Sequence, residues 1–176
     1  MTVTEQIKFD IQCLRVYFKK LFDLKAEQLS ADSSNVPHVE HSIVSFIKPD
    51  MVCNVYSLVD FWMKKLCLYQ KQKNKLALSF KDIKGENDLD AYQKYLTKVV
   101  MIDLSAVEDN YKSLQRLRNL RNKFVHDGGH MPSDGNKGIS VGRGVHESGS
   151  LIVIEDSFIL GWLDDASVYL CSIART

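Results

Sequence analysis

The sequence predicts a mostly α-helical protein, an antiparallel helical bundle with a small β-hairpin before the C-terminal helix. The first observation is that apolar residues recur at three- and four-residue steps through most of the chain, which is the period of an amphipathic helix. The second is that the composition after Gly129 becomes rich in glycine and polar residues, with short apolar runs typical of strands. Sequential helices with short connections favour antiparallel neighbours. We expect residues 1–176 to form a single domain.

The first two helices are predicted on either side of a polar stretch. A helical stripe covers residues 4–29, and the polar residues 30–37, which end in a proline, predict a loop. The second helix spans about 41–73. We expect a break or kink in it near Pro49, since proline has no backbone N–H and clashes with the preceding turn.

The middle of the chain contains a connector over 76–87, a shorter helix over 89–100 and then a long amphipathic helix. Ser105 and Glu108 have capping-box spacing, which predicts that they begin the long helix. Glycine accepts the left-handed conformation of a helix end, so Asp127-Gly128-Gly129 should stop it. The residues expected to face inward are Val107, Tyr111, Leu114, Leu117, Leu120 and Phe124.

Two short apolar runs predict the hairpin. Residues 139–141 and 151–154 are expected to be its strands, joined by a long loop. Asp156 or Ser157 can then cap the last helix. The inward face expected for that helix carries Phe158, Trp162, Ala166, Tyr169 and Ile173.

Composition and charge narrow the class of protein. Hydrophobic residues make up 45% and charged residues 26%, which is typical of a globular chain, and no run of 18 apolar residues predicts a membrane span. The net charge of +1 means that any nucleic-acid contact must come from a local patch. The N-terminus does not resemble a secretory signal, and the scattered cysteines are typical of free thiols, so we expect a cytoplasmic protein. The cysteines are Cys13, Cys53, Cys67 and Cys171, three of them within apolar helical patterns.

The residues best suited to chemistry are Arg121 and His126, near the end of the long helix. Histidine can move a proton near neutral pH, and arginine can hold two phosphate oxygens at once. Five helical steps turn by about 500°, so the two side chains should point roughly 140° apart. They could meet at one phosphate only where the helix frays or ends, or where a partner subunit completes the site. A histidine near a helix C-terminus is also a common partner of the helix dipole.

The segment Arg121-Asn122-Lys123-Phe124-Val125-His126 resembles the signature of the HEPN superfamily, small helical proteins in which an arginine, a polar residue and a histidine lie near the end of a bundle helix. The resemblance covers the sequence from about Leu114 to Gly129, and the architecture more widely. It implies a metal-independent endoribonuclease without a cofactor. Such proteins often act as the toxin of a toxin–antitoxin or antiphage system.

The resemblance also implies a homodimer in which two copies of the motif line one cleft. The substrate 2′-hydroxyl would attack its own phosphodiester and leave a cyclic phosphate. His126 would act as general acid or base, Arg121 would stabilise the developing charge, and Asn122 would orient the site. Some members carry a modified tyrosine two residues after the histidine. Gly128 occupies that position here, so the resemblance does not extend to that form of regulation.

Basic residues around the motif are consistent with an RNA substrate, because phosphate binding needs local positive charge. The segment 112–123 contains no acidic residue, and a second basic run covers 64–75. The second run is as compatible with an ordinary solvated face. The predicted RNA-binding residues are Lys112, Arg116, Arg118 and Lys123.

The sequence suggests two other interpretations. The first is a zinc site, but His38 and His41 are three residues apart and lack the His-Glu-x-x-His pattern of such a site, so no metal is expected. The chain could instead be a non-catalytic helical module that binds a partner protein or a nucleotide. Possible partners therefore include an antitoxin or another regulatory protein as well as RNA.

Overall fold

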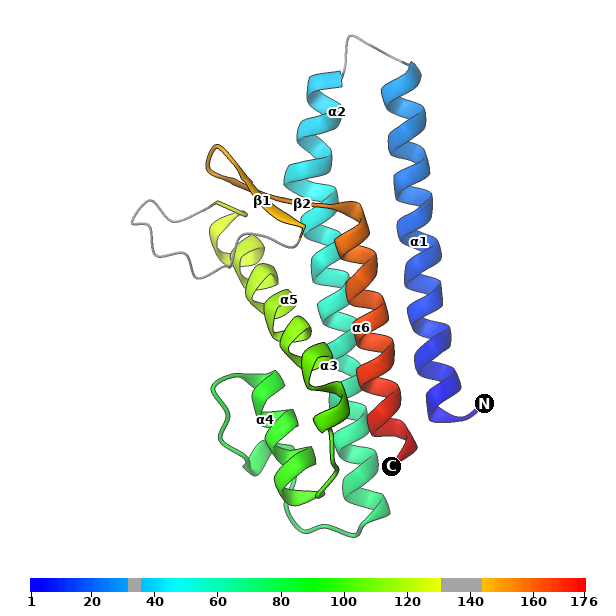
Figure 1. Cartoon of the computed structure of the whole chain (residues 1–176), viewed down its shortest axis with the longest axis vertical. Coiled ribbons are helices and arrows are strands. Elements are labelled where there is room, and N and C mark those ends of the chain that lie inside the picture. Colours follow the sequence, from blue (N-terminus) through cyan, green and yellow to red (C-terminus); the bar gives the residue numbers. More distant parts are fainter. Residues whose placement is uncertain (32–35, 131–143) are drawn as a thin grey trace.

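The computed structural model describes residues 1–31, 36–130 and 144–176, and it confirms the predicted fold class (Figure 1). A helical bundle makes up most of the chain, and a two-stranded antiparallel sheet precedes the last helix. The helices are α1 (Val3–Ala31), α2 (Val36–Ser42), α3 (Lys48–Lys73), α4 (Asp88–Lys94), α5 (Glu108–Asp127) and α6 (Asp156–Arg175).

The four long helices alternate in direction. The chain runs one way along α1 and α5 and the opposite way along α3 and α6, so both ends of the chain lie at the same end of the bundle (Figure 1). Helix α6 is central, since it packs against α1, α3 and α5. Its side chains Trp162, Ala166, Tyr169 and Ile173 are buried as predicted, whereas Phe158 is only partly buried. Burial of these apolar faces is the main stabilising contribution.

Helix α1 begins at a reciprocal cap that was not predicted. The Thr2 N–H donates to Glu5 Oε2 at 2.6 Å, and the Glu5 N–H donates to Thr2 Oγ1 at 3.2 Å. The helix extends to Ala31, and α2 begins at Val36. The predicted loop over 30–37 is therefore too long at both ends, because its polar residues also tolerate helical turns; its centre, 32–35, lies outside the described residues.

The predicted break near Pro49 is confirmed. Between α2 and α3 the helix widens into a π turn over Ile43–Ile47, and Pro49 lies in the first turn of α3. Proline cannot donate to the preceding turn, and a π bulge is one of the few ways in which a helix absorbs that missing bond.

The segment before α5 differs from its prediction in one respect. The predicted shorter helix is present as α4 followed by a π turn over Tyr95–Val99. The predicted capping box at Ser105 and Glu108 is wrong, because 105–107 forms a single 3-10 turn and α5 begins at Glu108 without a side-chain cap. The carboxylate of Asp103 instead accepts from the Ser105 N–H at 2.9 Å.

The hairpin is shorter than predicted. Its strands are β1 (Val145–Ser148) and β2 (Leu151–Ile154), and they pair with Ser148 opposite Leu151. The connection is thus a tight turn at 149–150, and the predicted long loop is wrong. The sequence did not predict β1, because this strand buries only Val145 and lacks an apolar pattern. The predicted strand 139–141 lies outside the described residues.

The start of α6 is held by an ion pair in place of a cap. Its N-cap residue is Glu155 and no side chain caps the helix, so the predicted capping by Asp156 or Ser157 is wrong. Lys48 Nζ of α3 lies 2.9 Å from Asp156 Oδ1 and also donates to the Ile154 carbonyl. This buried lysine joins α3 to both the hairpin and α6.

The cysteines and the helix lengths complete the description. All four cysteines are free thiols, with Cys67 and Cys171 buried, Cys53 partly buried and Cys13 exposed. Burial raises the pKa of the Cys67 thiol to about 12, so it stays protonated and unreactive.

Among the described helices, none is both long and apolar enough to cross a membrane.

Candidate functional site

The C-terminal end of α5 is closed by its two glycines. Gly128 adopts the left-handed conformation with φ of 59°, and its N–H donates to the Lys123 carbonyl. The Gly129 N–H donates to the same carbonyl at 3.2 Å. The helix remains regular through Asp127. His126 therefore lies on a formed helical turn, and the idea that a frayed end brings Arg121 to it is wrong for this chain.

The hairpin fixes this helix end from the other side. The Ile152 N–H of β2 donates to the Gly129 carbonyl at 3.0 Å, and His130 forms a β-bridge with Leu151. A Cβ atom on Gly129 would lie 2.8 Å from the Phe124 ring, and its φ of 77° also favours glycine. The position of His126 is thus set by a helix end, a glycine turn and a strand.

Arg121 lies on the α3 side of α5. Its guanidinium carbon is 5.8 Å from the centre of the Tyr56 ring. Burial raises the pKa of the Cys53 thiol, the Arg121 charge lowers it, and Asp50 raises it, which places the arginine charge beside α3. Arg121 is partly buried in this position.

His126 points to solvent on a different face of α5. Its side chain is exposed and helps to line an open hollow of about 270 Å³. Arg121 is not among the residues that line it. The two motif residues thus diverge within one chain, as the helical spacing predicts. The hollow is lined by Asn119, Asn122, Lys123, His126 and Asp127.

Asn122 connects the two faces. Arg121 Nη1 donates to Asn122 Oδ1 at 3.0 Å, and Asn122 lies one helical turn before His126. The bond occupies the amide oxygen, which leaves the Asn122 NH₂ group as the donor available to the hollow. Arg121 therefore determines which end of the amide is presented beside His126.

The four predicted RNA-binding residues do not form one continuous patch. Lys112 pairs with Glu108 at 2.9 Å, and Lys123 pairs with Asp127 at 2.8 Å, so two of the positive charges have acidic neighbours on the same helix. Arg118 faces α3. Burial and Asp60 raise the pKa of the Tyr56 hydroxyl, whereas the charge and hydrogen bond of Arg118 lower it.

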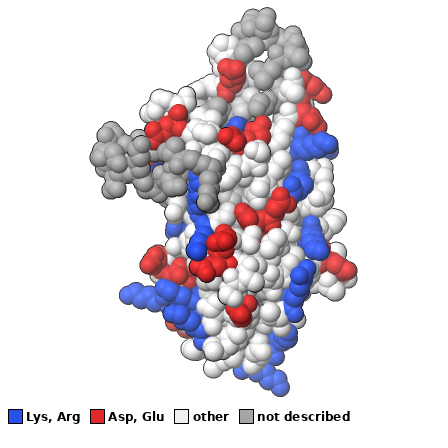
Figure 2. Space-filling model, in the orientation of Figure 1, with Lys and Arg blue, Asp and Glu red and all other residues white. Residues whose placement is uncertain are grey.

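Arg116 faces α6, where its guanidinium carbon lies 4.9 Å from the centre of the Phe158 ring. Lysine and arginine side chains also gather along α1, at one edge of the molecule (Figure 2). Positive charge is therefore spread over several helices, and on α5 only part of it shares the face of His126. The basic residues of α1 include Lys8, Arg15, Lys19 and Lys20.

Two features of the site escaped sequence reasoning. Asn119 lines the hollow, and the spacing of Asn119, Asn122 and His126, at i, i+3 and i+7, is a signal that could have revealed it. Tyr56, which faces Arg118 and Arg121, lies on α3, and no local pattern connects it to α5.

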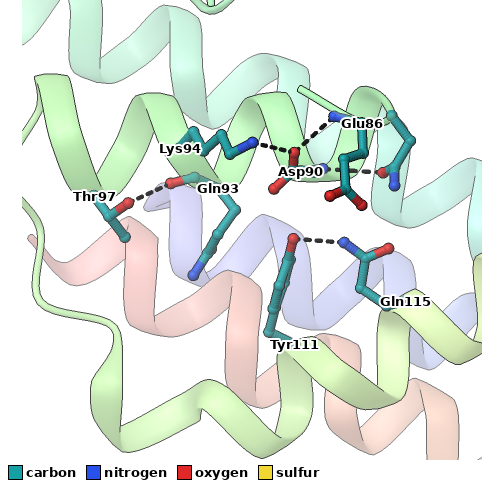
Figure 3. Close-up of polar contacts among 8 residues, drawn as sticks. Glu86, Asp90, Gln93, Lys94, Thr97, Tyr111 and Gln115 are labelled. Carbon is teal, nitrogen blue, oxygen red and sulfur yellow. Dashed lines mark hydrogen bonds and ion pairs between the residues drawn. The ribbon is translucent and has the colours of Figure 1, made fainter. Parts of the chain in front are cut away.

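A separate polar cluster joins the segment around α4 to α5 (Figure 3). The Asp90 carboxylate lies 2.7 Å from Lys94 Nζ and accepts from the Glu86 N–H at 2.8 Å. On α5, Gln115 Nε2 donates to the Tyr111 hydroxyl at 2.5 Å, and Glu86 points toward both residues (Figure 3). Their bonds are made within the cluster, which lies outside the hollow. We interpret it as structural, since it orients the beginning of α5.

No protein-family model, no curated protein and no solved structure matches this chain. Within the described ranges, no three histidine, cysteine, aspartate or glutamate side chains lie together as metal ligands would. His41 Nδ1 instead lies 3.5 Å from Ser45 Oγ, one turn along the helix. The functional argument therefore rests on the geometry at the end of α5.

Proposed function

We propose that this protein is a metal-independent endoribonuclease that acts through Arg121, Asn122 and His126. The observation that supports it most directly is the 3.0 Å bond from Arg121 to Asn122, which links the arginine to an amide beside an exposed histidine. These are the three named residues of the Arg-Asn-x3-His segment. An arginine, an amide donor and an exposed histidine are the groups that phosphodiester transesterification needs.

The reaction breaks one P–O bond and forms another. The 2′-oxygen of a ribose attacks the adjacent phosphorus, the 5′-oxygen of the next nucleotide leaves, and a 2′,3′-cyclic phosphate remains. His126 takes the proton from the 2′-hydroxyl or gives one to the leaving oxygen. The Asn122 amide and Arg121 stabilise negative charge on the phosphorane oxygens.

A homodimer supports this chemistry better than a single chain. The hollow at His126 is open to solvent and excludes Arg121 of the same chain. Pairing two α5 helices about a twofold axis would bring the Arg121 of one copy toward the His126 of the other. It would also place two copies of Lys123 at one cleft, where they could donate to phosphate oxygens in place of Asp127.

Within this proposal the protein acts in the cytoplasm as the toxin of a toxin–antitoxin or antiphage system. An antitoxin would act by covering the exposed hollow. The alternative is a non-catalytic module that binds a protein or nucleotide, and no contact in the described structure favours it over the enzyme.

The test is cleavage of total RNA in the presence of EDTA. The wild-type chain should cut RNA and leave cyclic-phosphate ends, and His126→Ala should not. His130→Ala is the matched control, because His130 is also exposed near the same helix end but lies outside the hollow. Absence of cleavage by the wild-type chain at any concentration would contradict the enzyme and favour the binding module.

A further inference from the structure

A second cleft lies away from His126, between α5 and α6. It has a volume of about 460 Å³, and it is not part of the hollow described above. The residues that line it are Asp109, Asn110, Lys112, Ser113, Arg116, Phe158 and Asp165.

One of the lining residues is a planar cation that faces an aromatic ring. The Arg116 guanidinium carbon lies 4.9 Å from the centre of the Phe158 ring. Two neighbours fix the position of Phe158. Its ring packs edge-on against Trp162, with ring centroids 4.5 Å apart. The Gly144 backbone also lies so close that a Cβ atom on Gly144 would come within 2.8 Å of the Phe158 side chain. An arginine plane supported by an aromatic ring is a surface on which nucleobases stack.

The wall of the cleft is polar and is built by two helices. Asp165 of α6 accepts from Asn110 Nδ2 at 2.8 Å and from Ser113 Oγ at 2.5 Å, so both α5 donors are engaged. The Asp109 side chain is fully exposed at the rim, 3.7 Å from Lys112 Nζ. The Asp109 carboxylate is therefore an accessible acceptor at this cleft, beside the exposed Lys112 amine.

The mixed positive and negative charge of the cleft favours a neutral nucleobase over an anionic phosphate. Among the described residues, the lining carries two cations, Lys112 and Arg116, and two anions, Asp109 and Asp165. A phosphate would be repelled by the carboxylates, whereas a neutral base with N–H donors would be attracted. Guanine has such an edge, since its N1–H and N2–H₂ groups can donate together to one carboxylate.

The cleft and His126 lie on the same helix. Arg116 precedes His126 by ten residues on the same helix, or about 15 Å. At the ~3.4 Å spacing of stacked nucleotides this distance corresponds to about four nucleotides. Lys123 lies on α5 between the two places and can contact a phosphate there.

We propose that the cleft between α5 and α6 is a guanine subsite, in which the base stacks on Arg116 and donates to Asp109. This inference rests on the proposed ribonuclease function. It assigns to the enzyme a preference for RNA with guanine within about four nucleotides of the cut.

The experiment uses RNA that cannot be cleaved, so that binding is measured apart from catalysis. Uridine hexanucleotides with 2′-O-methyl groups and one central guanosine or adenosine are titrated into ¹⁵N-labelled protein. The chain has two tryptophans. Trp162 packs against Phe158, while Trp62 donates to Asp10 on the α1 side and serves as an internal control.

The guanosine oligonucleotide should shift the Trp162 indole signal, leave the Trp62 signal in place and bind at least 5-fold more tightly than the adenosine oligonucleotide. Arg116→Lys keeps the charge but loses the plane, and should weaken guanosine binding about 10-fold. Asp109→Asn should abolish the preference for guanosine. Arg15→Lys, on α1, is the matched control and should change nothing.

Two results separate the proposals. If both oligonucleotides bind equally and shift residues around His126 but leave Trp162 unmoved, the subsite is wrong and the ribonuclease stands. If the guanosine oligonucleotide shifts Trp162 as expected but wild-type protein cuts no RNA, the subsite stands and the catalytic proposal fails. If neither oligonucleotide binds, the subsite is overturned.

Discussion

The side chains of Arg121 and Asn122 are bonded to each other although they follow one another on α5, with Nη1 3.0 Å from Oδ1. Adjacent helical residues point about 100° apart, so this contact requires the two side chains to bend toward each other. The arginine thus faces the Tyr56 ring and also fixes the amide beside His126.

Replacing Arg121 by lysine should reduce RNA cleavage about 100-fold, because the compact ammonium lacks the planar fork that reaches Asn122 and a phosphate at the same time. Initial rates on a single RNA substrate measure the loss. Arg15→Lys is the control, because it also replaces a guanidinium by an ammonium, in the ion pair with Asp164 and outside the hollow. This variant should cleave RNA like the wild type. Full activity in Arg121→Lys would mean that only positive charge is needed.

Gly129→Ala should lower the free energy of unfolding by about 2–3 kcal/mol. The added methyl group would meet the Phe124 ring at 2.8 Å in a left-handed backbone conformation. Gly149→Ala is the control, since φ is also positive there but no atom lies within 4 Å, and it should cost about 1 kcal/mol. Urea unfolding of the three proteins gives both differences; equal losses would show that Phe124 moves aside.

The chain should form a homodimer at micromolar concentration if the active site is shared between copies. Light scattering gives the mass, which is 20.1 kDa for one chain. Mixing inactive Arg121→Ala and His126→Ala chains should restore at most about a quarter of the wild-type activity, because half of the dimers are mixed and each has one site that contains both Arg121 and His126. The chain that supplies His126 to that site lacks the Arg121–Asn122 bond, which lowers the gain further. A monomer whose mixture stays inactive would contradict the shared site.

Stability should fall in acid, with Asp90 as one source. Burial raises the pKa of the Asp90 carboxyl, but the Lys94 side chain and the Glu86 N–H together lower it below 3.8 (Figure 3). A lowered pKa in the folded state stabilises the protein above the unfolded value, and this contribution is lost as the pH falls through the folded value.

Asp90→Asn should therefore reduce stability at neutral pH by about 1 kcal/mol and flatten the decline below about pH 4. Thermal unfolding at pH 7, 4 and 3 measures both effects. Asp23→Asn, on the exposed face of α1, is the control. An equally steep decline in Asp90→Asn would place the acid-sensitive groups elsewhere.

The sequence predicted those features that depend on local chemistry. The helical stripes, the break before Pro49 and the glycine stop at Gly128 each follow from steric or hydrogen-bonding rules within a few residues, and the structure contains all three. The angle between Arg121 and His126 follows from helical periodicity, and it too was predictable.

The features that escaped prediction depend on distant parts of the chain. The first strand of the hairpin is polar apart from Val145, and it pairs through its backbone with β2. The capping box expected at Ser105 and Glu108 is absent. The Asp103 carboxylate accepts the hydrogen bond from the Ser105 N–H, because several polar side chains compete for that N–H. The contact between Arg121 and Tyr56 needs α3 beside α5, which only tertiary packing supplies.

The central place of α6 bears on how the molecule matures during translation. The ribosome makes α6 after α1, α3 and α5, so the faces that pack on it stay uncovered until it emerges. The strand that secures the Gly129 carbonyl is also made after His126. In the proposed ribonuclease, α5 of a nascent chain would therefore emerge from the ribosome before its contacts with β2 and α6 can form. The chain would become able to cut RNA only after α6 had been synthesised.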